Sequence, residues 1–199
     1  KNFPAPTGAK FMGTGVNENE GAKPDNTRPA IIIVGAPRSG SYLLATVLES
    51  AFDVAIPVDT HFIPLFARHA HLWGNLEELD NRAALLADIY RFLRLWARAF
   101  AVGEDAASPS FTLLSTESEA TAIIDSTTDY HGLVREMYSV FARHHGRGNF
   151  GDKSVYFQPS DIERIATSLA PAKIIHIIRD GRAVCASWRR TWFGPHSVL

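Results

Sequence analysis

Residues 31–48, IIIVGAPRSGSYLLATVL, constrain the fold of this chain more than any other stretch. They begin with an unbroken β-branched run at residues 31–34, which is typical of a buried strand. A turn that contains Gly35 and Gly40 follows, and apolar residues then recur at helical spacing through Leu48. The first N–H groups of a helix have no partner within it, and the helix dipole makes that end electropositive. The stretch therefore predicts a strand, a tight turn and a helix whose N-terminus binds a phosphate.

Further strands and helices alternate along the chain. The remaining predicted strands cover residues 54–56, 150–154 and 173–178, and the predicted helices cover residues 41–51, 79–100, 129–144, 160–170 and 182–190. This alternation predicts a three-layer α/β/α fold of the P-loop NTPase-like kind, with a central parallel sheet covered on both faces. Residues 1–28, rich in Gly, Pro, Asn and Glu, are predicted to form a surface arm or linker, and residues 29–199 a single domain.

Local signals mark several boundaries. One apolar face is predicted for the helix at residues 79–100, formed by Leu79, Ala83, Leu86, Leu93, Trp96 and Phe100, and Gly103 is expected to end this helix. Residues 103–118 are predicted to be a turn-rich, mobile loop. The pair Ser160 and Glu163 has the spacing of a capping box, and Pro171 ends the helix that it begins. The run KIIHII at residues 173–178 predicts a second buried strand.

Composition limits the classes of function. The 199 residues carry a formal net charge of −1, so they lack the basic excess of a dedicated nucleic-acid-binding protein. The single cysteine, Cys185, excludes an internal disulfide framework and favours a reducing compartment, from which we expect a cytoplasmic protein. No apolar run reaches the length of a membrane span. We therefore expect neither nucleic acid nor a membrane span among the partners and features of this chain.

Polar residues follow the predicted strands and would meet at one edge of the sheet. They are the turn at residues 35–41, the segment at residues 59–64, which we expect to be a loop, Lys153 and Arg179. Ligands of parallel α/β sheets bind outside the carboxyl ends of the strands, at the point where the strand order reverses. We therefore expect these segments to form one site.

The turn differs from a nucleoside triphosphate P-loop at two positions. The pattern GxxxxGK[ST] would place Lys where this chain has Ser41 and a magnesium-binding hydroxyl where it has Tyr42. Without these groups a β,γ-phosphate–magnesium unit is poorly held. The turn still offers backbone N–H groups with Arg38, Ser39 and Ser41 for one phosphate group. A short anionic chain is thus favoured over ATP or GTP, and a P-loop kinase or NTPase stays the less favoured alternative.

Residues 35–41, GAPRSGS, resemble the loop with which sulfotransferases that use 3′-phosphoadenosine 5′-phosphosulfate (PAPS) bind the 5′-phosphosulfate. A second signature of that family is an Arg at the end of a strand and a Ser eight residues later, which together hold the 3′-phosphate. Residues 179–187, RDGRAVCAS, are similar to it, with Arg179 and Ser187 in those places. A bidentate guanidinium with a hydroxyl suits a phosphate monoester dianion.

Two further segments are similar to the branch of the family that includes tyrosylprotein sulfotransferases and many bacterial relatives. Residues 59–64, DTHFIP, resemble the segment that carries the catalytic base, and residues 151–154, GDKS, resemble the segment whose Lys contacts the transferring sulfuryl group. The resemblance implies Asp59 as the base and Lys153 at the sulfuryl oxygens. It also implies that His61 polarises the sulfuryl group or positions the acceptor.

The resemblance, which spans most of the chain, also implies the reaction and its cofactors. A sulfuryl group would pass in line from PAPS to an acceptor hydroxyl or amine, with adenosine 3′,5′-bisphosphate (PAP) as product and no metal. The acceptor would be a small molecule, a carbohydrate or a protein. The donor-binding residues implied are Pro37, Arg38, Ser39, Gly40, Ser41, Tyr42, Leu43, Arg179 and Ser187.

Three departures from the family pattern keep alternatives open. Asp59 stands where the family has the longer Glu, and Tyr42 stands where it has Thr or Ser. The sequence ends at Leu199, soon after the 3′-phosphate signature, so we expect a domain incomplete at its C-terminus. The alternative expectation is a homodimer. A protein that binds PAPS without catalysis is therefore an alternative function. Asp59 has the alternative role of a helix N-cap, and Lys153 that of a solvated loop residue.

Overall fold

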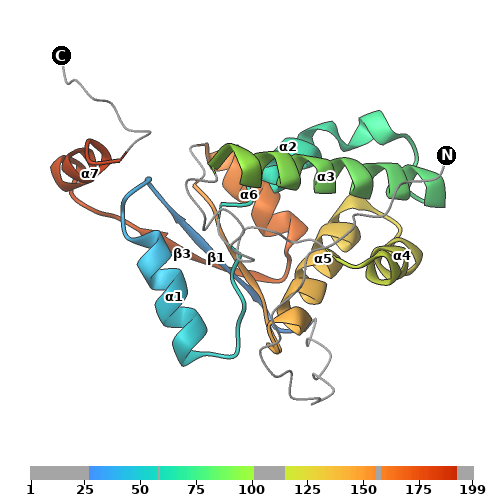
Figure 1. Cartoon of the computed structure of the whole chain (residues 1–199), viewed down its shortest axis with the longest axis horizontal. Helices are drawn as coiled ribbons and strands as arrows, with labels where there is room; N and C mark the ends of the chain where they lie inside the picture. Colours follow the sequence, from blue (N-terminus) through green and yellow to red (C-terminus); the bar gives the residue numbers. More distant parts are fainter. Residues whose placement is uncertain (1–26, 58, 101–114, 156–157, 192–199) are drawn as a thin grey trace.

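The computed structural model describes residues 27–57, 59–100, 115–155 and 158–191 (Figure 1). The predicted arm at residues 1–28 lies outside this part of the chain except for its last two residues. Gly103 and most of the predicted loop at residues 103–118 also lie outside it. No helix within the described ranges is long and apolar enough to cross a membrane.

The described residues form a three-stranded parallel sheet in the order β2–β1–β3, with helices on both faces. The strands are β1 (Ala30–Gly35), β2 (Gly151–Lys153) and β3 (Ala172–Ile177). The helices are α1 (Ser41–Ala51), α2 (Phe62–His69), α3 (Leu79–Phe100), α4 (Glu117–Ser126), α5 (Tyr130–His144), α6 (Pro159–Ser168) and α7 (Gly181–Trp188), with a 3₁₀ turn η1 (Ala70–Trp73) after α2. The predicted α/β class with a parallel sheet is confirmed.

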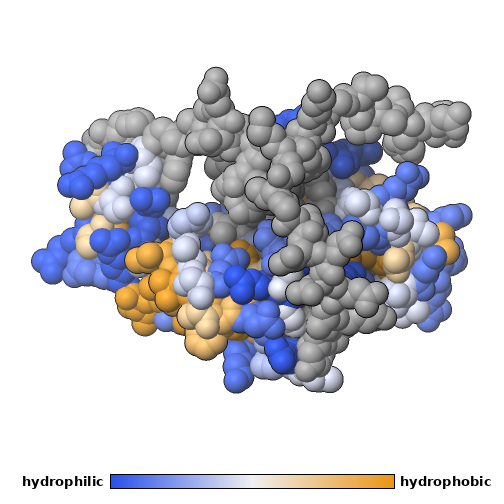
Figure 2. Space-filling model, turned by 60° about the horizontal axis from the view of Figure 1, so that its bottom comes forward, coloured by the Kyte–Doolittle hydropathy of each residue, from blue (hydrophilic) through white to orange (hydrophobic). Residues whose placement is uncertain are grey.

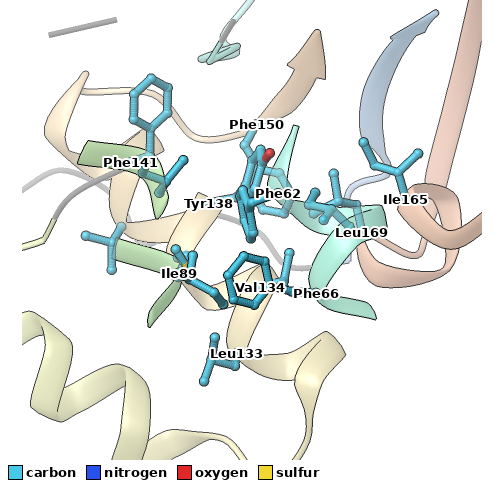
Figure 3. Packing of buried hydrophobic residues seen from close by; sticks show 14 of the residues in the cluster. Phe62, Phe66, Ile89, Leu133, Val134, Tyr138, Phe141, Phe150, Ile165 and Leu169 are labelled. Carbon is cyan, nitrogen blue, oxygen red and sulfur yellow. The ribbon is translucent and has the colours of Figure 1, made fainter. Parts of the chain in front are cut away.

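The central strand β1 has a hydrophobic core on each side. Because successive side chains of a strand point to opposite faces, Ile32 and Val34 join the larger core with α2, α3, α5 and α6, whereas Ile33 packs under α1. Figure 3 shows the larger core, in which the Tyr138 ring lies against Phe62 and Phe150. This arrangement fixes the carboxyl end of β1, from which the phosphate-binding turn leaves.

The segment predicted as a strand at residues 54–56 forms a single bridge instead. Ala55 pairs in parallel with Phe150, and the segment continues beside β2 through hydrogen bonds from Lys153 N to Pro57 O and from Asp59 N to Lys153 O. Pro57 has no N–H to donate, which interrupts the ladder. The prediction was wrong in its extent, but the segment lies at the expected edge of the sheet and delivers Asp59 next to Lys153.

The prediction of a buried strand at residues 173–178 was also wrong. The strand forms as β3, but it lies at an edge of the described sheet, and 48% of Ile174 is exposed. An apolar run predicts a strand whose two faces are both covered by helices. The described helices cover β3 only in part. Figure 2 shows apolar side chains gathered on the face that α1 and β3 form, where Val47 of α1 is 49% exposed.

Helix prediction succeeded where the apolar period was long. The helix predicted at residues 129–144 forms as α5, with Asp129 as its N-cap, and its predicted apolar side is buried. Helix α3 forms within the predicted helical region, but its buried face is centred on Leu85, Ile89 and Leu93, while Leu79 is half exposed. The predicted end at Gly103 lies outside the described residues.

Three helical starts were mispredicted. Helix α2 begins at Phe62, inside the segment expected to be a loop. Helix α4 was not predicted, although Thr116 and Glu119 form a complete capping box at its start. Helix α6 begins at Pro159 and not at a Ser160 cap, because proline is favoured in the first helical position.

Candidate active site

The turn between β1 and α1 wraps tightly against the carboxyl end of β3. A Cβ on Gly35 would lie 2.9 Å from the Ile177 carbonyl oxygen and 2.9 Å from Ser39 Oγ, so no larger residue fits without a shift. Arg38 and Gly40 both have positive φ, of 65° and 104°. Glycine adopts this conformation at little cost, and Gly40 thereby directs the chain into α1.

The turn presents unpaired hydrogen-bond donors. The first backbone bond of α1 runs from Leu44 N to Gly40 O, so the N–H groups of Ser41, Tyr42 and Leu43 have no partner within the helix. Ser39 Oγ is buried and has no hydrogen-bond partner among the described residues. A buried orphan hydroxyl indicates a missing partner, and an anionic oxygen would satisfy it. The turn therefore fits a phosphate group.

The predicted donor-binding residues of this turn differ in how far they are exposed. Ser39 and Ser41 are buried against it, whereas Tyr42 is 63% and Leu43 67% exposed. The phenol of Tyr42 therefore points into solvent and leaves the turn uncrowded. Tyr42 and Leu43 offer the turn their backbone N–H groups and not their side chains.

The two predicted phosphate signatures come together although 141 and 149 residues separate them. The guanidinium of Arg179 donates to the Arg38 carbonyl oxygen at 2.8 Å, and Arg38 Nε donates to Ser187 Oγ at 3.2 Å. They border a cavity of about 460 Å³ lined by Arg38, Arg179, Ala183, Ala186, Ser187, Arg190 and Thr191. The described lining includes three arginines, so the cavity suits a dianion. Thr191 was not singled out from the sequence.

Local structure explains how Ser187 reaches this cavity. Asp180 accepts hydrogen bonds from the backbone N–H groups of Arg182 and Ala183, which starts α7 directly after β3. Two turns of this helix then bring Ser187 back toward the end of the strand. The cavity lies beyond the carboxyl ends of the parallel strands β1 and β3, which is the usual side for a ligand in such sheets.

A second group of predicted residues lies at the ends of β2 and of the neighbouring segment. Lys153 Nζ is 2.8 Å from Asp59 Oδ1, and His61 Nε2 is 3.7 Å from the same oxygen. The Lys153 side chain is only 6% exposed, so it is not a solvated loop residue. Asp59 is not a helix cap, because His61 occupies the N-cap position of α2.

The loop that carries these groups is held in an uncommon backbone conformation. Asp59 and His61 both have φ of 54°, a left-handed conformation that is rare in residues other than glycine. Hydrogen bonds to the end of β2 hold the loop, from Asp59 N to Lys153 O at 2.6 Å and from Thr60 N to Ser154 Oγ at 3.0 Å. Strained residues of this kind cluster at functional sites, where the surrounding structure fixes them.

A buried polar network underlies the loop. Asp152 is completely buried, and its Oδ1 accepts hydrogen bonds from Thr60 Oγ1 at 3.0 Å and from the Tyr138 hydroxyl. No functional role for Tyr138, Thr60 or Asp152 was predicted. An acidic residue between Gly151 and Lys153 in a short predicted strand is the signal that could have revealed this network, since a buried carboxylate requires partners.

Comparison with known proteins identifies the family. The model of a family described as the sulfotransferase family matches residues 29–198, which include both groups of candidate residues. The chain belongs to the sulfotransferase family. Searches of curated proteins and of solved structures found no significant match. The predicted family is thus confirmed, and its membership supports a sulfotransfer activity, while the closer branch and the individual site residues stay predictions.

Burial favours the neutral form of His61. Burial lowers the pKa of His61, and Lys153 lowers it further, while the nearby Asp59 carboxylate raises it. The imidazole ring contacts the Trp96 indole edge-on, with 4.9 Å between ring centroids. A neutral imidazole in this place can accept or donate a hydrogen bond.

Across the described ranges, no group of three or more His, Cys, Asp or Glu side chains is arranged to hold a metal ion. Asp59 Oδ1 instead pairs with the Lys153 ammonium and lies near His61 Nε2.

Proposed function

We propose that this chain transfers a sulfuryl group from PAPS to an acceptor hydroxyl or amine. The observation that carries the proposal is the meeting of Arg38, Arg179 and Ser187 around one cavity, beside a turn with unpaired N–H donors. Two separate anion sites at one sheet edge suit a nucleotide with phosphate at both its 3′ and 5′ positions. ATP would require a lysine where Ser41 stands.

The donor would be held from two sides. The N–H groups that open α1, with the hydroxyls of Ser39 and Ser41, would bind the 5′-phosphate. Arg179 and Ser187 would bind the 3′-phosphate, and Arg38 would lie between the two. The orphan hydroxyl of Ser39 supports this assignment, since the described protein offers it no partner.

Lys153 and Asp59 would assist the transfer itself. The sulfur–oxygen bond to the 5′-phosphate breaks, a bond from sulfur to the acceptor oxygen forms, and PAP leaves with the electron pair of the broken bond. Lys153 would neutralise the charge that develops on the leaving oxygen, while Asp59 would take the proton of the acceptor. The register supports this role for Lys153, because Lys153 pairs with Ile33, two residues before the phosphate-binding turn begins.

Neutral His61 would orient the acceptor. Its Nε2 lies on the same side as Asp59 Oδ1, and its ring rests on Trp96. A ring fixed in this way directs one hydrogen bond toward a hydroxyl that approaches Asp59.

Calorimetry with PAP and with ATP–magnesium tests the donor site. We expect PAP to bind, Arg179→Ala to weaken PAP binding by about tenfold or more, and ATP–magnesium to bind less tightly. Arg94→Ala, at an exposed position on α3, is the matched control and should leave PAP affinity unchanged. Tighter binding of ATP–magnesium than of PAP would contradict the proposal.

Transfer is tested with sulfur-labelled PAPS and a panel of phenols, alcohols, sugars and peptides. Labelled product that depends on Asp59 and Lys153 supports the sulfotransferase function. Tight binding of PAP without transfer to any acceptor supports the alternative of a PAPS-binding protein without catalysis.

A further inference from the structure

An apolar groove runs along α2 and α3, outside the donor site. It has a volume of about 390 Å³, and its walls include Leu65, Phe66, Leu72, Trp73, Phe92 and Leu95. The three leucines are 44% to 68% exposed, and contact of these side chains with water is unfavourable unless an apolar group covers them. The groove is therefore a candidate binding site that the donor does not use.

Ring contacts link the groove wall to the proposed reaction centre. The two helices are antiparallel, since His61 at the start of α2 contacts Trp96 late in α3, and Phe66 contacts Phe92 one turn earlier. Figure 1 shows the two helices side by side. Trp96 stacks on Phe92, with 5.8 Å between ring centroids, and Phe92 lines the groove. Two ring contacts thus join the groove wall to His61 and, through it, to Asp59.

Specific contacts keep the far end of the groove open. Trp73 Nε1 donates to Asp88 Oδ2 at 3.1 Å, and the Trp73 ring stacks on Phe66 with 5.4 Å between centroids. The other oxygen of Asp88 accepts from Arg91 at 2.9 Å. The aromatic wall is therefore fixed in place, as in preformed ligand sites.

We propose that the groove binds the apolar body of the acceptor, so that the acceptor is an amphiphilic alcohol or phenol whose hydroxyl reaches Asp59. The inference rests on the proposed sulfotransfer function and names its class of acceptor. A carbohydrate fits poorly, because its hydroxyls would lose water against leucine and aromatic walls. The described lining carries three polar side chains, His69, Asp88 and Arg91, of which Asp88 and Arg91 pair with each other.

A series of 4-alkylphenols tests the groove by transfer from PAPS. Each added methylene should raise kcat/KM by about threefold until the groove is filled, because each buries apolar surface. Leu95→Asp, at an exposed position in the groove, should raise the KM for 4-octylphenol by about tenfold and leave phenol almost unaffected. Leu79→Asp, exposed on the same helix outside the groove, is the matched control and should behave as the parent.

Direct binding separates this inference from the proposed function. Calorimetry of 4-octylphenol with the whole chain, without donor, should show binding that Leu95→Asp weakens and Leu79→Asp does not. Such binding would support the groove as a binding site even if no transfer occurs. The absence of transfer would then count against the proposed function alone. Binding that is equal in the two variants, chain length without effect, or preferred transfer to a sugar or a polar peptide would overturn the inference.

Discussion

The Tyr138 hydroxyl donates a hydrogen bond to Oδ1 of Asp152, a carboxylate with no exposed surface. Tyr138 belongs to the core helix α5, and Asp152 directly precedes Lys153 in β2. Thr60 shares the same carboxylate oxygen. The core helix and the strained loop beside Lys153 are therefore joined through one buried carboxyl side chain.

Removing the hydroxyl in Tyr138→Phe should reduce both stability and transfer. Asp152 would lose one donor while buried, which costs about 1–3 kcal/mol in the free energy of unfolding. The loop at Thr60 should then be less well fixed and kcat should fall. Urea unfolding and steady-state transfer measure the two effects.

Tyr130→Phe is the matched control on the same helix, since its buried hydroxyl donates to the Ile63 backbone carbonyl and not to Asp152. It should destabilise the fold without the same loss of kcat. Equal kcat in both variants would show that the network is structural only.

Substitution of Gly35 by Ala should disrupt the phosphate-binding turn. The new Cβ would meet the Ile177 backbone oxygen, which cannot move without displacing β3. We expect a loss of about 1–3 kcal/mol in stability, by the usual cost of overpacking, together with weaker PAP binding. Gly181→Ala meets no atom within 4 Å and is the control. Parental thermal stability and PAP affinity in Gly35→Ala would refute this account of the turn.

Lys153→Met should separate binding from chemistry. The substitution keeps the length of a side chain that is 6% exposed but removes the charge opposite Asp59. Transfer should fall by about a hundredfold or more, since one lost electrostatic donor typically costs that much. PAP affinity should change little, because Arg38, Arg179 and Ser187 remain. Lys173→Met, at an exposed position on β3, is the control, and a matching loss of activity there would count against Lys153.

Asp59→Asn tests the proposed base without a change of shape. Loss of a positioned general base typically lowers the rate by about 10²–10⁴-fold, and we expect kcat to fall within that range. PAP binding is the control measurement and should be retained. An active Asp59→Asn enzyme would assign proton removal to another group.

The buried His61 should make stability depend on pH. Its pKa lies below the usual 6.5 in the folded chain, so the unfolded chain binds a proton at a higher pH than the folded chain does. The free energy of unfolding should therefore be fully retained above pH 6.5 and decline as the pH falls toward the lowered pKa. Urea unfolding between about pH 7.5 and pH 5 measures this, and His61→Gln should flatten the curve in this window. Parallel curves of unfolding free energy against pH for the parent and for His61→Gln would argue against a lowered pKa of His61.

The sequence alone predicted the features that depend on short stretches of the chain. The turn at residues 35–41 and the eight-residue spacing of Arg179 and Ser187 are short patterns, and each carries its own geometry. Long amphipathic periods likewise identified α3 and α5. The capping box at Thr116 and Glu119 was equally local, and α4 could have been predicted from it.

The contacts of the buried polar network could not be predicted from the sequence. The Tyr138–Asp152–Thr60 network joins three segments through pairing that depends on the register of β2. The exposure of β3 depends on which helices cover the sheet, which its apolar sequence does not encode. The positive φ of Asp59 and His61 is set by bonds to β2 and not by residue type.

Helix α7 stands apart from the other helices in Figure 1, and the bonds among Arg38, Arg179 and Ser187 connect it to the turn after β1. A dianion bound among these three side chains would fasten the last described helix to the first strand. The donor would then hold α7 in place, because the free energy of donor binding would add to the free energy with which α7 docks. Amide hydrogen exchange in α7 should slow when PAP is added, while exchange in α5, already within the core, should change little.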